Sequence, residues 1–100
     1  MESKKQTNFS EQAESYLDKA KYASDMIDPY LELLDKFEEQ EKEIDEQQSS
    51  PQNKEQLEIV RTKIEYTQSK VHLFHIKMLT HMEQYRIHKE LANLWETVLL

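Results

Sequence analysis

The chain contains no glycine, and this absence limits its fold more than any other feature of the sequence. Tight turns between β-strands need residues with positive φ angles, which glycine adopts at the lowest cost. The sequence therefore disfavours a β-sheet protein and predicts an all-α fold. Glycine-rich phosphate loops, dinucleotide-binding motifs and nucleophile elbows are excluded for the same reason. We expect no enzymatic activity, no catalytic residue and no cofactor.

Two prolines follow residues that commonly cap helix N-termini: Asp28 precedes Pro29, and Ser50 precedes Pro51. Proline is pre-organised for the first helical position, and a preceding Asp or Ser can accept hydrogen bonds from the first turn. Residues 47–53 have no apolar side chain, which predicts a loop around Pro51. Pro29 lies among apolar residues, so it predicts either a kink or a break in a helix.

The predicted order of elements follows from these signals. We expect a disordered tail over residues 1–8 and a single helical domain over residues 9–100. That domain would contain a helix over residues 9–47, kinked or broken at residues 28–29. A loop at 47–53 would connect it to a long helix over residues 52–99.

Apolar side chains recur every seven residues in both predicted helices, which is typical of helices that pack as in a coiled coil. In the first helix the repeat does not change phase at Pro29. The second helix has a further apolar row on a different face. The first helix has the row Phe9, Tyr16, Ala23, Tyr30, Phe37 and Ile44. The second has the rows Leu57, Ile64, Val71, Met78, Tyr85, Ala92, Leu99 and Val60, Thr67, Phe74, His81, His88, Trp95. Its further row is Ile59, Tyr66, Leu73, Thr80, Ile87 and Leu94.

The repeats predict a long antiparallel helical hairpin with a coiled-coil-like interface. Folding about the loop would bring Phe37 near Ile64 and Leu17 near His81. Because a hairpin buries only one side of each helix, we expect two copies to form a four-helix bundle dimer. If Pro29 is a true turn, a monomeric three-helix bundle is the alternative.

An apolar surface is predicted at the C-terminal end of the long helix. The N-terminal end of the first helix should lie near His88. The residues of the long helix beyond His88 should then have no cover from the first helix. Large uncovered apolar patches usually mark interaction sites, and tryptophan is enriched among binding hot spots. The candidate partner or dimer interface consists of Leu91, Leu94, Trp95, Val98 and Leu99.

The net charge of −7 is concentrated in residues 28–46, where nine acidic residues stand against two lysines. The opposite sign occurs along one edge of the long helix, at Lys63, Lys70 and Lys77. One interpretation is that these edges lie side by side within the fold or across a dimer. Another is that the segment mimics DNA for a nucleic-acid-binding partner. Its candidate acidic face consists of Asp35, Glu38, Glu39, Glu43 and Glu46.

All four histidines lie between residues 72 and 88. His72 and His75 have the spacing of a shared helix face, but zinc sites need three or four converging ligands, and no metal site is predicted. His81 and His88 occupy core positions, so we expect them to set the register of the helix pair. If they are buried without an acidic neighbour, desolvation favours the neutral ring, and stability should be lost as the pH falls.

These observations favour a non-enzymatic adaptor, chaperone-like factor or small regulator that binds a protein partner through the end of its long helix. Direct nucleic-acid binding is not expected, because the charge has the wrong sign. The chain has no cysteine, no apolar run long enough for a membrane span and no signal peptide, which predicts a cytoplasmic protein without membrane insertion.

A membrane-associated scaffold is the remaining alternative. The stretch Leu-Ala-Asn-Leu-Trp-Glu at residues 91–96 resembles the end of the last helix in the BAR domains of sorting nexins. The resemblance covers this stretch alone and implies long kinked helices that dimerise into curved bundles. The basic surface that such domains present to lipid is missing from this sequence.

Overall fold

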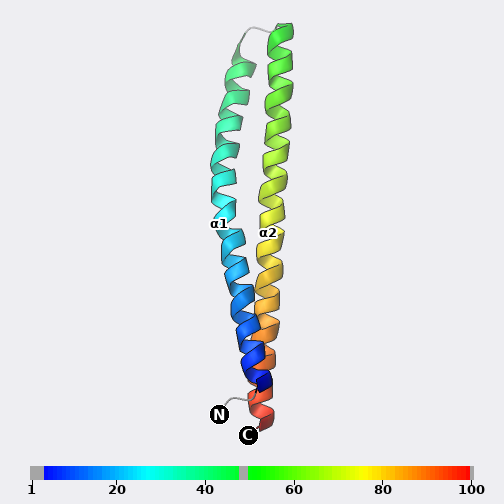
Figure 1. Cartoon of the computed structure of the whole chain (residues 1–100). Coiled ribbons are helices and arrows are strands. Elements are labelled where there is room, and N and C mark those ends of the chain that lie inside the picture. Colours follow the sequence, from blue (N-terminus) through cyan, green and yellow to red (C-terminus); the bar gives the residue numbers. More distant parts are fainter. Residues whose placement is uncertain (1–3, 48–49, 100) are drawn as a thin grey trace. The chain divides into compact units, whose positions relative to one another are not determined.

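The structure, a computed structural model, describes residues 4–47 and 50–99. Within these ranges it contains two α-helices and no strand: α1 (Lys4–Glu46) and α2 (Pro51–Leu99) (Figure 1). The predicted all-α fold is confirmed. Over the same ranges, neither helix has an apolar stretch long enough to cross a lipid bilayer.

The start of α2 follows from a cap that the sequence predicts. Ser50 accepts a hydrogen bond through its side-chain Oγ from the backbone N–H of Asn53, at 3.1 Å. Its backbone carbonyl accepts the N–H of Lys54, also at 3.1 Å. Pro51 occupies the first helical position, where its missing N–H has no intrahelical partner to lose. The loop is therefore shorter than the predicted 47–53, and residues 48–49 lie outside the described ranges.

Replacing the capping side chain should destabilise α2 measurably. We expect Ser50→Ala to lower the free energy of unfolding by about 1 kcal/mol, because it removes the Oγ that accepts the backbone N–H of Asn53 in the first turn. Urea denaturation followed by circular dichroism measures the change. Ser69→Ala is the matched control, since the exposed Ser69 hydroxyl only donates to the Glu65 carbonyl within the helix. Equal losses in both variants would contradict the cap.

A single helix passes through Pro29, so the predicted break is wrong. The three-helix bundle fails with it, because the described residues form two helices. Proline inside a helix costs about 3 kcal/mol through a lost hydrogen bond and a clash with the carbonyl four residues earlier. Here Pro29 and Asp25 are both exposed, so water can solvate the freed carbonyl. The apolar row also keeps its phase across Pro29, and a turn would separate side chains that now pack on one face.

The helix α1 also begins earlier than predicted, at Lys4 instead of Phe9. Residues 1–3 of the predicted tail lie outside the described residues, and residues 4–8 are helical. Lysine and glutamine have high helix propensity, so a polar first turn can extend a helix that is anchored further along.

The chain divides into two units, which we describe separately. Unit 1 contains Met1–Ser24 and His75–Leu100. Its two helix segments run antiparallel, because Phe9 contacts His88 and Tyr16 contacts His81, with ring centroids 6.4 and 6.3 Å apart. Small side chains let the helices approach closely. The buried apolar residues of this unit are Ala13, Ala20, Ala23 and Ala92.

Unit 2, Asp25–Phe74, is a helical hairpin that includes the loop. The rings of Tyr30 and Phe74 stack with centroids 5.7 Å apart, and the Nζ of Lys63 lies 5.7 Å from the ring centroid of Phe37. Val60 and Thr67 are its buried residues. Phe37 contacts Lys63, and Tyr16 lies between His81 and His88, close to the predicted neighbours Ile64 for Phe37 and His81 for Leu17.

Candidate interaction surfaces

The residues predicted as a C-terminal interface divide between two faces of α2. Leu94 and Val98 are 62% and 67% exposed, and Leu91 is 37% exposed. Trp95 is half-buried, and its indole nitrogen is enclosed. The side chain of Leu99 lies outside the described part of the chain. An exposed apolar surface is present, but Trp95 is less exposed than Leu91, Leu94 and Val98.

Two physical reasons explain why Trp95 lies inward. It occupies the same seven-residue row as His81 and His88, which face α1 in unit 1. In addition, α1 begins at Lys4, so it covers more of α2 than the sequence predicted. The part of α2 that α1 leaves uncovered is therefore shorter than predicted. Its exposed side chains belong to rows other than that of Trp95.

A further apolar row on α2 is exposed along the helix. Every large apolar member of this row is at least 41% exposed, whereas the core-row residues from Leu57 to Trp95 are buried or half-buried. Its exposed members are Ile59, Tyr66, Leu73, Ile87 and Leu94. The seven-residue periodicity of the sequence identifies this row, and the structure shows that neither helix covers it.

Unit 2 has an apolar groove of about 460 Å³ on one side of the helix pair. Tyr66 is 60% exposed and Leu33 is 40% exposed at its rim. The residues that line this unit 2 groove are Tyr30, Leu33, Phe37, Thr62, Lys63, Tyr66 and Thr67. Sequence reasoning missed the groove, because only the rotation of the helices shows that Leu33 and Tyr66 border the same opening.

Two of the three lysines predicted as a basic edge lie at the unit 2 groove. The Nζ of Lys63 is above the ring of Phe37, and the Nζ of Lys70 is 5.5 Å from the ring centroid of Tyr66. Ammonium groups within about 6 Å of an aromatic ring are attracted to its face. The groove therefore combines an apolar lining with positive charge along α2.

All five members of the predicted acidic face are exposed. Glu41 and Arg61 form an ion pair that joins α1 to α2, at 3.1 Å. A stripe that sequence reasoning missed repeats every seven residues on α1, and each member is exposed: Glu11, Asp18, Asp25, Glu32, Glu39 and Glu46.

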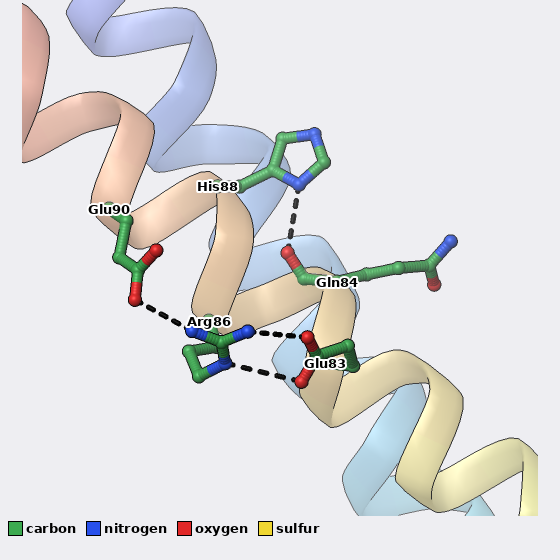
Figure 2. A network of polar contacts seen from close by, with 5 residues as sticks. All are labelled: Glu83, Gln84, Arg86, His88 and Glu90. Atoms are coloured by element: carbon green, nitrogen blue, oxygen red, sulfur yellow. Dashed lines mark hydrogen bonds and ion pairs between the residues drawn. The ribbon is translucent and has the colours of Figure 1, made fainter.

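The histidines predicted as core residues do lie at the helix pair. His81 and His88 are half-buried, and the ring centroid of His88 is 4.9 Å from that of Tyr16. The Nδ1 of His88 lies 2.8 Å from the carbonyl oxygen of Gln84, so this nitrogen carries a proton and donates it (Figure 2). The Nδ1 of His81 lies 3.0 Å from the side-chain Oε1 of Gln84. The predicted loss of stability at low pH stays a prediction.

The other two histidines, His72 and His75, are exposed. No cluster of three or more potential metal ligands occurs within residues 4–47 and 50–99.

An exposed charged network lies beside His88 on α2. Figure 2 shows Arg86 between two carboxylates, with its Nε 3.2 Å from Glu83 and its Nη1 2.7 Å from Glu90. The hydrogen bond from Arg86, together with its charge, holds the pKa of Glu83 below the ordinary value, and Glu83 in turn raises the pKa of Arg86. These pairs span one turn of one helix, so they support α2 locally and do not connect it to α1.

The described residues therefore present exposed apolar rows bordered by exposed charged side chains. Comparison of the chain with protein-family models, curated proteins and solved structures finds no match.

Proposed function

We propose that this protein is a non-enzymatic interaction module, a small helical adaptor, chaperone-like factor or regulator. It binds a partner protein through exposed apolar side chains near the C-terminal end of α2. The observation that supports this function is the exposure of Leu94 and Val98, each above 60%, beside Leu91. Three apolar side chains within two helical turns form the kind of patch that monomeric proteins rarely leave in water.

The mode of binding follows from the helix on which these residues lie. Leu91, Leu94 and Val98 have the i, i+3 and i+7 spacing with which a helix enters an apolar groove or completes a bundle. Trp95 and Ala92 pack inward on the same turns. Their packing fixes the rotation of the C-terminal turns of α2 about the helix axis. The three exposed side chains therefore face solvent, where a partner can bind them.

The apolar end can be tested without disturbing the fold. We expect Leu94→Asp combined with Val98→Asp to abolish capture of a specific protein from an extract, because charged groups cannot enter an apolar groove without a large desolvation cost. The retained proteins are identified by mass spectrometry. Trp95 is left intact, because it is half-buried and its loss would also destabilise the helix pair.

The matched control is Leu79→Asp combined with Met82→Asp. These residues are 53% and 43% exposed, lie on the same helix in the same unit and give the same change in charge. The control should capture the same protein as the unaltered chain. If both double variants capture it equally, or both lose it, the proposed binding end is wrong.

The acidic segment supports a second function, that of a decoy which resembles the phosphates of DNA. Eight of its nine acidic side chains are exposed, and the ninth, Glu41, is half-buried and paired with Arg61 on α2. Salt-sensitive competition with DNA for a nucleic-acid-binding protein would favour this function over an adaptor. The BAR-like scaffold gains no comparable support, since a net charge of −7 opposes binding to anionic lipid.

The proposed module also assembles with itself, two copies making a four-helix bundle. The support for self-association is the apolar row Ile59, Tyr66, Leu73, Ile87 and Leu94 on α2, whose members are each at least 41% exposed and which a second copy would cover.

A further inference from the structure

We infer that unit 1 contains an acid-sensitive contact: protonation of His81 and His88 separates residues 4–24 of α1 from α2 and uncovers Trp95, while the helix pair of unit 2 stays together. The inference adds a trigger to the proposed function, since Trp95 would then join the exposed side chains of the binding end. It rests on that function only in this last step. The separation itself is a property of unit 1 and can be measured without a partner.

Both histidines contact the same aromatic ring of α1. The ring centroid of Tyr16 lies 4.9 Å from that of His88 and 6.3 Å from that of His81, and Phe9 meets His88 edge-on at 6.4 Å. All four rings are half-buried, and we call them the ring cluster. The buried apolar residues of unit 1 are four alanines, which remove little apolar area from water. The ring cluster therefore supplies a large part of the contact between the helices in this unit.

The neutral imidazoles have polar partners on their own helix. The Nδ1 of His88 donates to the carbonyl oxygen of Gln84 at 2.8 Å, so the proton gained in acid goes to Nε2 (Figure 2). The Nδ1 of His81 lies 3.0 Å from the side-chain Oε1 of the same Gln84. Protonation turns each ring into a cation, and a cation at a half-buried position loses hydration that it regains when the helices separate.

The charge that α1 brings to the ring cluster is also positive. The Nζ of Lys19 lies 5.2 Å from the ring centroid of Tyr16, so this ammonium and both imidazoles share one ring. On α2, the titratable side chain next to Gln84 is the half-buried Tyr85, and the exposed Lys77 and Lys89 are cations. The acidic residues of the same turns are exposed, and those on α2 are paired with Arg86: Glu11, Glu14 and Asp18 on α1, and Glu83 and Glu90 on α2.

Protonation therefore gathers three positive charges around Tyr16. An aromatic ring attracts a cation to its face, and Lys19 already lies there. Three like charges around one ring repel one another, and this repulsion is relieved when α1 moves away from α2. Acid should thus favour the separated state of unit 1.

The helix contacts described in unit 2 contain no imidazole. Its histidine, His72, is exposed. The contacts are the stacked rings of Tyr30 and Phe74, Lys63 over Phe37, and the ion pair of Glu41 with Arg61. Most carboxylates keep their charge above about pH 5, so mild acid leaves this ion pair intact. The separation is therefore confined to unit 1, where Trp95 is half-buried in the same row as His81 and His88.

The test uses Trp95, the single tryptophan of the chain, as a reporter of unit 1. Quenching of its fluorescence by acrylamide is measured on the full chain at pH 7.5 and pH 5.5, a range in which imidazole takes up its proton. We expect the quenching constant to rise about twofold or more at pH 5.5, because local opening exposes the indole. Amide hydrogen exchange should quicken in residues 4–24 and stay unchanged in residues 26–47.

Two pairs of histidines give matched variants. His81→Gln combined with His88→Gln should remove the response, because glutamine takes up no proton. His72→Gln combined with His75→Gln changes two exposed histidines and should keep it. The inference is overturned by an absent rise in the unaltered chain, by a rise that survives without His81 and His88, by its loss in the exposed pair, or by equal exchange in both units.

A charge reversal tests the ring cluster without replacing any of its members. Lys19 is exposed, so Lys19→Glu leaves the packing unchanged and puts a carboxylate beside both imidazoles. The midpoint pH of the fluorescence response should fall by about 0.5 or more. Lys21→Glu gives the same change in net charge at an exposed position two residues further along, and it should leave the midpoint unchanged. Equal shifts in both variants would contradict the inference. None of these measurements uses a partner, so failure of the proposed binding end would not affect them.

Discussion

Ala20→Glu should lower the free energy of unfolding by about 3 kcal/mol or more, a larger effect than we expect from any other single change. Ala20 is 2% exposed in unit 1, between the neighbouring buried residues Ala13 and Ala23. A longer side chain would force the helices apart, and a carboxylate would lose its hydration without gaining a partner. For a chain of this size the melting temperature should fall by roughly 15 °C. Thermal unfolding followed by circular dichroism measures it.

The control for this variant is Ser24→Glu. Ser24 is exposed on α1 only four residues further along, so the same charge is added with the same change in net charge. Its melting temperature should remain close to that of the unaltered chain. A comparable loss in Ser24→Glu would show that added negative charge on α1, and not burial of Ala20, determines stability.

Tyr16→Ala should produce the second largest effect, a loss of about 2 kcal/mol. The ring of Tyr16 is half-buried, and its centroid lies 4.9 Å from His88 and 6.3 Å from His81. Removing it leaves a void between the helices and exposes both imidazoles. Chemical denaturation gives the change in free energy of unfolding.

Tyr22→Ala provides a matched comparison, because Tyr22 is 64% exposed on the same helix and in the same unit. We expect its effect to stay within about 0.5 kcal/mol, as for most surface substitutions. Equal effects of the two tyrosine substitutions would mean that helix propensity, and not the contact with the histidines, accounts for the loss.

These two predictions depend on a small core. Among the described residues, the buried apolar side chains are four alanines and one valine, and the larger apolar residues are half-buried or exposed. Alanine permits a close approach of helices but removes little apolar area from water. Burial of the exposed rows by another chain would therefore add considerably to stability, which is why self-association and partner binding are the functions that we propose.

Local chemistry made several features predictable from the sequence. The absence of glycine and the Ser50-Pro51 cap determine two helices and the start of the second, because capping and helix propensity act within a few residues. The seven-residue repeat likewise placed Tyr16, His81 and His88 on facing rows. Periodicity alone is enough to group residues on a face and to align two antiparallel rows.

Only the tertiary structure decided the rest. In the structure, α1 continues through Pro29. Trp95 is half-buried while Leu94 is exposed, and unit 2 has an apolar groove. Each of these outcomes depends on how far one helix is rotated against the other and on which distant segment covers a given turn. Propensity and periodicity describe one helix at a time, so they do not contain the energy of packing between segments far apart in the chain.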